Sequence, residues 1–156
     1  MPQFANDQAE VLERMRSAQV TKTVVVATEE AEIAPVLTLA RENDGLYAAF
    51  AVSPQDEALP DLTEEEIVLR VQDPKMVAVG ETGLDYHYCQ EPLDWQRNRF
   101  ATHIRAANLA NKPLIIHSRE AACDTLDILK ANGAQNCGFV LHCFCGDWDL
   151  LKRLWI

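Results

Sequence analysis

Three residues with metal-binding side chains stand at the ends of apolar, β-branched runs in the second half of the sequence. They are Glu81, His117 and His142, and each lies one strand–helix unit after the previous one. Carboxylate oxygen and imidazole nitrogen are ligands for Zn²⁺ and Mn²⁺, and carboxylate also serves Mg²⁺. A carboxylate at the end of an apolar strand is costly unless positive charge compensates it, which a metal ion would do. The pattern therefore favours a shared metal site, provided that the three strands end at the same mouth of the sheet.

Each of these residues also has an ordinary structural explanation. A histidine at the end of a strand is most often a hydrogen-bonded structural residue, and Glu81 could pair with a nearby cation such as Arg119. Their recurrence at corresponding positions of successive units is what favours a common site. Spacing alone leaves both explanations open.

The elements that must position these residues alternate regularly along the chain. Strands are predicted at residues 21–28, 46–52, 76–80, 114–117 and 138–142. Helices are predicted at residues 6–18, 29–43, 91–111 and 120–132, from about 147 onward, and in a short segment opened by a capping box at residues 63–66. The apolar runs lack clean alternation, which is typical of parallel strands buried on both faces. The sequence thus predicts an α/β fold of right-handed βαβ units.

The bulk composition is that of one ordinary globular domain. The chain has 156 residues, of which 48% are hydrophobic and 24% charged. No apolar run is long enough to cross a bilayer, the first residues do not resemble a secretory signal, and the five cysteines form no even framework. We therefore expect a cytoplasmic protein with no membrane contact and no evident protein partner. The net charge of −10 argues against a basic surface that grips many phosphates, although bound divalent cations would reverse the local field.

Three sequence segments resemble signatures of a known family. Residues 79–86, V-G-E-T-G-L-D-Y, resemble the V-G-E-x-G-L-D-[YF] signature of the TatD family of metal-dependent deoxyribonucleases. Residues 112–119, K-P-L-I-I-H-S-R, are similar to its K-P-[LV]-x-[IV]-H-x-R segment, and residues 141–144, L-H-C-F, are similar to its L-H-C-F segment. The motifs occur in the family's order and at its spacing, so the resemblance covers essentially the whole chain and is weakest near the N-terminus.

The resemblance implies a fold, an activity and a ligand set. The family has a TIM-type (β/α) barrel within the amidohydrolase superfamily, binds divalent metal ions (Mg, Mn or Zn) and hydrolyses phosphodiester bonds of DNA or oligonucleotides. It implies that Glu81 is the catalytic carboxylate that can bridge two metals in the complete site. It also implies that His117 and His142 are ligands of the second metal. A glutamate here, where many relatives in the superfamily use a modified lysine, favours the TatD branch.

The chain departs from the family pattern at three places. It contains no H-x-H motif, whose two histidines hold one metal, and no late aspartate in an E-T-D-S-P type segment. At the end of the second run, where the family usually has G-[VIL]-H-P, the sequence reads A-V-S-P, so that Ser53 replaces the histidine. TIM barrels typically need about 250 residues. We therefore expect residues 1–156 to form a single partial domain, an incomplete barrel of about strands two to six.

With this reduced ligand set, we expect the chain to be weakly active or inactive as a deoxyribonuclease. Two alternatives stay open at this point. One is a non-catalytic remnant that keeps the scaffold. The other is a metal-dependent hydrolase that acts on a small phosphate or amide.

Further candidates flank the predicted ligands. Arg119 could bind a substrate phosphate through its guanidinium group, or it could pair with Glu120 or Asp85. Asp85 and Tyr86 follow Glu81 and are expected to line the substrate groove. Phe100, Ile104 and Ala107 form a predicted apolar stripe on the helix at residues 91–111. His103 lies near this stripe, so we predict a core position for it.

Overall fold

A computed structural model describes residues 6–89, 91, 93–144 and 146–154 of the chain. Its strands are β1 (Thr23–Ala27), β2 (Leu46–Phe50), β3 (Met76–Asp85), β4 (Leu114–Arg119) and β5 (Phe139–Leu141). Its helices are α1 (Gln8–Ser17), α2 (Glu30–Glu42), α3 (Glu64–Arg70), α4 (Asp94–Ala110), α5 (Ala122–Ala131), the 3-10 turn η2 (Ala134–Asn136) and α6 (Trp148–Leu154). Every predicted strand and helix is present. Residue 92 and residues 155–156, which fall in predicted helices, lie outside the described residues.

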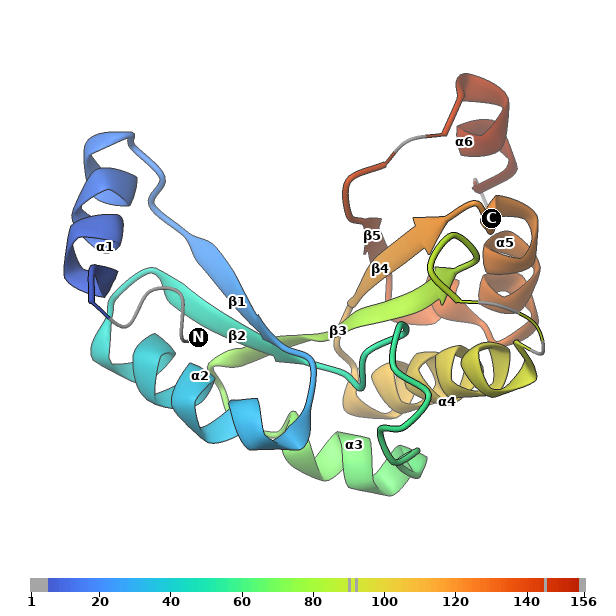
Figure 1. The fold of residues 1–156 in the computed structure, drawn as a ribbon, viewed down its shortest axis with the longest axis horizontal. Coiled ribbons are helices and arrows are strands. Elements are labelled where there is room, and N and C mark those ends of the chain that lie inside the picture. Colours follow the sequence, from blue (N-terminus) through green and yellow to red (C-terminus); the bar gives the residue numbers. More distant parts are fainter. Residues whose placement is uncertain (1–5, 90, 92, 145, 155–156) are drawn as a thin grey trace.

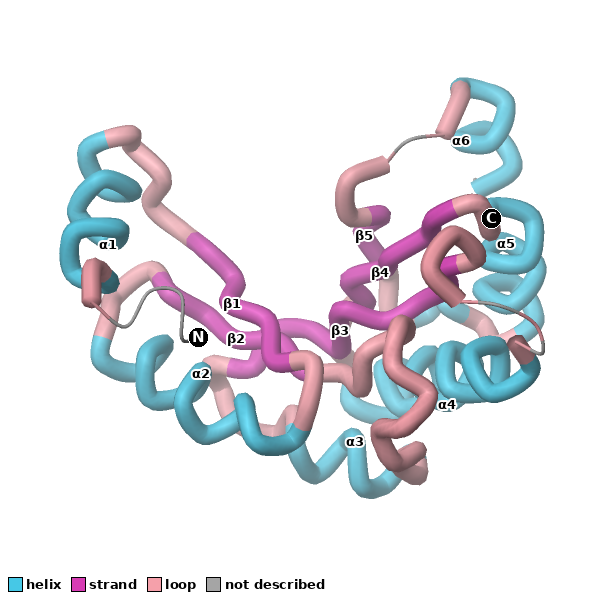
Figure 2. The backbone as a smooth tube through the Cα atoms, in the orientation of Figure 1, coloured by secondary structure: helices cyan, strands magenta, loops and turns pink. Residues whose placement is uncertain are grey.

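The five strands form one parallel sheet in the order β1-β2-β3-β4-β5. One α-helix separates each strand from the next in the sequence, with η2 added between α5 and β5. Figure 1 shows α2, α3 and α4 below the curved sheet with α5 beside β4. Figure 2 shows the strands as a continuous band whose two ends rise away from the central β3. Part of the wall of a (β/α) barrel has this arrangement, because each βα unit adds its strand beside the previous one. No helix in the described part of the chain is long and apolar enough to cross a membrane.

The core lies between the sheet and the helices that cover it. The predicted apolar stripe of α4 is confirmed, since Phe100, Ile104 and Ala107 are fully buried. They pack in one cluster with strand residues that include Phe50 and Ile116. Burial of a side chain of this size contributes about 1.5–3 kcal/mol. The same helix therefore both closes the core and fixes the position of the central strand β3.

The central strand β3 is longer than predicted. It continues through Glu81 as far as Asp85, whereas the prediction ended the strand before Glu81. The pairing with β4 shifts between Gly80 and Thr82, which leaves Glu81 as the extra residue of a bulge. A bulge redirects a side chain while the strand continues, and it has no reliable signal in a single sequence. β4 likewise continues beyond His117.

The loop between β2 and α3 is held against α4 by a buried arginine. The guanidinium of Arg99 is nearly inaccessible, and it donates to the backbone oxygens of Ser53, Asp56 and Leu59 at 2.7, 2.7 and 2.8 Å. It also pairs with Asp61 at 2.7 Å. Three backbone carbonyls that would otherwise need water are satisfied by one side chain. The loop that carries Gln55 is thereby fixed beside the end of β3.

His103 occupies the core position that the sequence predicts. Its side chain is 1% exposed. Its Nε2 accepts from the backbone N–H of Val52 at 3.2 Å, and its Nδ1 lies 2.9 Å from the hydroxyl of Thr82. Because Nε2 accepts, the proton of the neutral ring is on Nδ1. The histidine thus connects α4 to β3 and to the segment after β2.

Candidate metal centre

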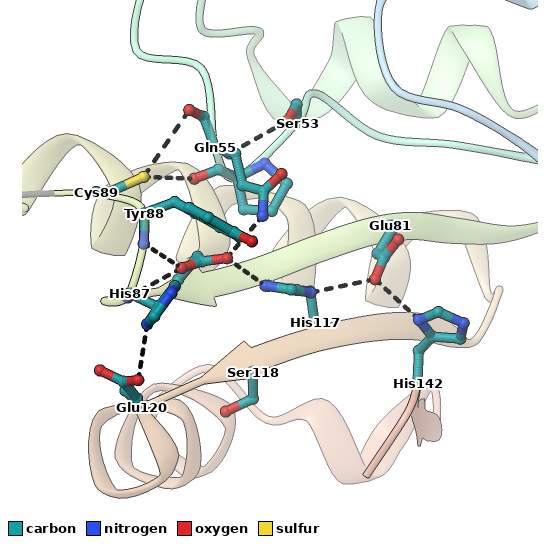
Figure 3. Close-up of polar contacts among 12 residues, drawn as sticks. Ser53, Gln55, Glu81, His87, Tyr88, Cys89, His117, Ser118, Glu120 and His142 are labelled. Atoms are coloured by element: carbon teal, nitrogen blue, oxygen red, sulfur yellow. Dashed lines mark hydrogen bonds and ion pairs between the residues drawn. The ribbon is translucent and has the colours of Figure 1, made fainter. Parts of the chain in front are cut away.

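Glu81, His117 and His142 come together, as the sequence predicts. Oε1 of Glu81 lies 3.4 Å from Nδ1 of His117 and 3.1 Å from Nδ1 of His142 (Figure 3). Glu81 points from the β3 bulge and His117 from within β4, rather than from strand ends. His142 follows β5 directly, and its backbone N–H bonds to the carbonyl of Ile116 at 2.8 Å. One carboxylate oxygen therefore faces two imidazole nitrogens from neighbouring strands.

The donor set fits one divalent ion in its chemistry and in these two separations. Two ligands bound to one ion at about 2.1 Å lie about 3.0–3.4 Å from each other in tetrahedral or octahedral geometry. Both nitrogen–oxygen separations fall in that range. Within the described ranges, however, no group of three or more His, Cys, Asp or Glu side chains is arranged as a metal cluster. Binding would therefore have to draw the three donors around the ion.

The pKa values of Glu81 and His117 are both shifted in the direction that favours the charged form of the side chain. The contact with His117 lowers the pKa of Glu81, and it outweighs the opposing effect of burial. The same contact raises the pKa of His117, aided by a second carboxylate, that of Asp85. A carboxylate on each side of one imidazole makes this a local centre of negative charge that attracts a cation.

The prediction that Asp85 lines the substrate groove is wrong. Asp85 is the last residue of β3, and its side chain is fully buried. Its Oδ2 accepts from Nε2 of His117 at 2.8 Å and from Nε2 of Gln55 at 2.6 Å. Its Oδ1 accepts from the backbone N–H groups of His87 and Tyr88 at 3.0 and 2.8 Å. Burial would raise the pKa of Asp85, but these hydrogen bonds outweigh it and the pKa is lowered.

A cleft of about 830 Å³ opens beside the three residues, between β4, α5 and the start of α6. His117, His142 and Arg119 are among the residues that line it. The guanidinium of Arg119 stacks on the ring of Tyr88, with 4.7 Å to the ring centroid. Arg119 forms no ion pair within the described residues, and Glu120 instead pairs with His87 at 2.9 Å. Arg119 is therefore an exposed cation that contributes to the lining of the cleft, with its guanidinium packed on Tyr88.

Tyr86 also lines the cleft, but its hydroxyl is already engaged. It donates to Oδ2 of Asp124 at 2.6 Å and accepts from Nε of Arg97 at 2.9 Å. Burial and the hydrogen bond to Asp124 raise the pKa of Tyr86 to about 12. The neutral phenol is thus fixed as part of the wall of the cleft, and it is not a base.

Sequence reasoning missed two residues of this region. Gln55 lies in the irregular loop after β2, where no periodic pattern marks it, and its contact with Asp85 depends on how Arg99 folds that loop. Asp124 lies in the first turn of α5, where an acidic residue is already favoured by the helix dipole. Its helical position gives no hint of the bond to Tyr86.

Comparisons with known proteins agree on one family. A family model described as "TatD related DNase" matches residues 1–155. The chain is 37% identical over 155 residues to the Bacillus subtilis "Uncharacterized metal-dependent hydrolase YabD", covering 97% of this chain and 60% of that protein. It is 43% identical over 145 residues to the Mycobacterium tuberculosis "Uncharacterized metal-dependent hydrolase TatD", covering 88% and 54%. It is also 31% identical over 145 residues to the Shigella flexneri "3'-5' ssDNA/RNA exonuclease TatD", covering 92% and 56%.

A solved structure supports the same assignment. The crystal structure of YjjV, a TatD homologue from Escherichia coli, superposes with a TM-score of 0.87 at 30% identity, over 99% of this chain and 60% of that one. Together with the strand order, this match confirms the predicted fold, a TIM-type (β/α) barrel of which the chain forms part. The chain spans 54–60% of the length of these four relatives.

Proposed function

The chain belongs to the family of TatD-related DNases, and from that premise we propose that its site serves the metal-dependent hydrolysis of phosphodiester bonds in DNA. The observation that carries the proposal is the single carboxylate oxygen of Glu81 between the Nδ1 atoms of His117 and His142. These three residues would hold the ion, and the names of relatives as metal-dependent hydrolases support a divalent cation. The chain is proposed to be one part of a single barrel domain.

The chemistry follows from what these side chains do. A divalent ion supplies a Lewis acid and lowers the pKa of a bound water. Glu81 contributes the negative charge that balances the ion, and the two histidines contribute neutral nitrogen donors. Asp85 holds the far side of the His117 ring, so that the ring does not turn away from Glu81.

Arg119 is the residue proposed to bind the substrate. It is exposed, lines the same cleft as His117 and has no local acid to neutralise it among the described residues. A guanidinium group matches the oxygens of a phosphate better than any other side chain. Tyr86 is proposed to contribute the wall against which the nucleotide lies. The relative described as a 3'-5' ssDNA/RNA exonuclease supports a nucleic-acid substrate.

By itself, the 156-residue chain is proposed to bind metal weakly and to have little nuclease activity. Three donors lie near one another, but the described residues contain no formed cluster, and a closed site needs four or more ligands. A two-ion clamp on the attacking and leaving oxygens needs further donors. These facts keep the non-catalytic remnant as a second candidate.

Two measurements test the proposal. Calorimetric titration with Mn²⁺ is expected to show binding weaker than about 1 μM, lost in His117→Ala. A nuclease assay on single-stranded DNA with Mg²⁺ or Mn²⁺ should then compare this chain with a version extended at both ends, using Glu81→Ala of each as the control against contamination. Activity in the extended protein that Glu81→Ala abolishes supports the proposal. Unchanged activity in Glu81→Ala, or metal binding unaffected by His117→Ala, overturns it.

A further inference from the structure

We propose that Asp85, held in place by Gln55, is a positioning residue that fixes the tautomer of His117 so that Nδ1 carries a lone pair directed at the metal position. The proposal rests on the metal site proposed above, because Nδ1 is the atom that faces Glu81. Its basis is the hydrogen-bond pattern around one fully buried carboxylate, which no sequence motif reveals. Figure 3 shows the His117 ring with Gln55 and Tyr88 toward one side and Glu81 on the other.

Every described partner of the Asp85 carboxylate is a donor. Its Oδ1 receives the backbone N–H groups of His87 and Tyr88, and its Oδ2 receives the side-chain amide of Gln55. A carboxylate with three such donors has no proton to give, so the fourth contact, to Nε2 of His117 at 2.8 Å, requires an N–H on that nitrogen. In the neutral ring, Nδ1 is then unprotonated.

The opposite edge of the His117 ring, which carries Nδ1, explains why this tautomer matters for metal binding. Nδ1 of His117 lies 3.4 Å from Oε1 of Glu81. With the proton on Nε2, this places a nitrogen lone pair opposite a carboxylate oxygen, and two acceptors at that separation need a cation between them. A metal ion satisfies both, whereas the opposite tautomer would place an N–H where the ion must bind.

The position of Gln55 is itself determined by the surrounding structure. The preceding residue, Pro54, accepts from Nε2 of Gln96 at 2.5 Å, and Arg99 bonds to the carbonyls on both sides of this segment. Gln96 and Arg99 are both buried residues of α4. The Gln55 amide therefore reaches Oδ2 of Asp85 from a loop fixed at several points. It leaves that oxygen little freedom to move away from His117.

The substitution Asp85→Asn separates this role from simple packing. The two backbone N–H groups need an acceptor, so the amide oxygen of the new side chain takes the place of Oδ1. Its NH₂ group then faces both the Gln55 amide and Nε2 of His117. Unlike the backbone N–H groups, both can adapt: the Gln55 amide turns to present its oxygen, Nε2 becomes the acceptor, and the ring proton moves to Nδ1. The size of the side chain is nearly unchanged, so the expected effect is an inverted tautomer rather than an unfolded chain.

The experiment reads the tautomer directly, in metal-free protein. The ¹⁵N chemical shifts of the His117 ring are recorded at increasing pH until they stop changing, so that the neutral ring is observed. The wild-type chain is expected to show the Nε2–H tautomer and Asp85→Asn the Nδ1–H tautomer. Mn²⁺ and Zn²⁺ titrations are expected to show affinity reduced by about 10–100-fold in Asp85→Asn. Gln55→Leu keeps the tautomer and loses affinity by a smaller factor.

The matched control is Asp124→Asn, which makes the same change of carboxylate to amide beside the same cleft. Asp124 bonds to Tyr86 rather than to His117, so the His117 ring signals are expected to stay as in wild type. A wild-type ring in the Nδ1–H form, or an Asp85→Asn ring in the Nε2–H form, overturns the proposal, and the first of these outcomes does not depend on any variant folding. The proposal is also overturned if Asp124→Asn inverts the His117 tautomer as Asp85→Asn does. If Asp85→Asn inverts the tautomer but the wild-type chain binds no metal, the positioning role of Asp85 stands and the proposed metal site is refuted instead.

Discussion

The ring nitrogens of His117 and His103 all have partners in this chain, but the two histidines lie in regions of opposite character. The His117 ring, at the mouth of the sheet, lies between the carboxylates of Glu81 and Asp85, and its side chain is 23% exposed. The His103 ring lies between a backbone N–H and the hydroxyl of Thr82, and the residue is 1% exposed. The contacts with the two carboxylates raise the pKa of His117, whereas burial, together with the charge of Arg99, lowers the pKa of His103 to about 3.

The difference shows that the partners decide what a histidine can do. An imidazole ring between two carboxylates is stable only when a positive charge compensates them. His117 is therefore suited to bind a proton or a metal ion. A ring between neutral groups in the core stays neutral, and it acts as a hydrogen-bonded spacer between β3 and α4. The two roles should therefore respond differently to substitution and to pH.

The largest expected effect comes from breaking the contact between the strands that build the first region. Gly83 has φ +139° and pairs with His117, and a Cβ at Gly83 would lie 2.0 Å from the carbonyl oxygen of His117. Gly83→Ala is expected to lower the free energy of unfolding by about 3 kcal/mol or more, because β3 and β4 must separate. Urea unfolding followed by circular dichroism measures the loss.

Gly138→Ala is the matched control for the backbone conformation. Gly138 also has positive φ, at +77°, but nothing lies within 4 Å of its Cβ position. The strain alone is expected to be about 1 kcal/mol. Equal losses in the two variants would show that the close approach of β3 to β4 at His117 does not constrain the chain.

The next expected effect compares the two histidines directly. His103→Ala removes a fully enclosed ring and leaves the N–H of Val52 and the hydroxyl of Thr82 without partners, so stability should fall by about 3 kcal/mol. His117→Ala should reduce stability by about 1 kcal/mol or less, because Asp85 keeps three other donors. Unfolding in EDTA measures both values. A larger loss of stability for His117→Ala than for His103→Ala would contradict the assignment of His103 to the core and of His117 to the site.

The pH dependence of stability sharpens the same contrast. Because the pKa of His103 is lowered to about 3 from an ordinary 6.5, the unfolded state binds the proton first. Its contribution to stability is full above pH 6.5 and is lost as the pH falls toward 3. The slope from this one group is at most about 1.4 kcal/mol per pH unit. Between pH 6.5 and 5, His103→Gln should flatten the dependence seen in wild type. An unchanged slope would contradict the buried neutral ring.

Much of the scaffold was predictable because its signals are local or periodic. The stripe of α4 and the cap at residues 63–66 follow from spacing along one helix, and the parallel βαβ units follow from the alternation of strands and helices. The sequential strand order was implied by the family resemblance. Glu81 and the two histidines were found as residue types at recurrent positions. The roles within the site were harder, because they depend on contacts between distant segments. The burial of Asp85 requires Gln55 and His117, which lie 30 and 32 residues away.

The smallest expected effect lies at the start of α3, away from both histidines, and it calibrates the comparison. The hydroxyl of Thr63 accepts from the backbone N–H of Glu66 at 3.3 Å, and the Glu66 carboxylate accepts from the N–H of Thr63 at 2.8 Å, which completes the predicted capping box. Thr63→Ala removes one of these two bonds at an exposed helix end, so stability should fall by about 1 kcal/mol. Thr63→Ser, which keeps the hydroxyl, should restore most of it. Metal affinity and the His117 ring signals should match wild type in both variants, because the cap shares no contact with Asp85 or Glu81. If Thr63→Ala altered the His117 signals as Asp85→Asn is expected to, those signals would report general loosening of the chain rather than the orientation of one ring.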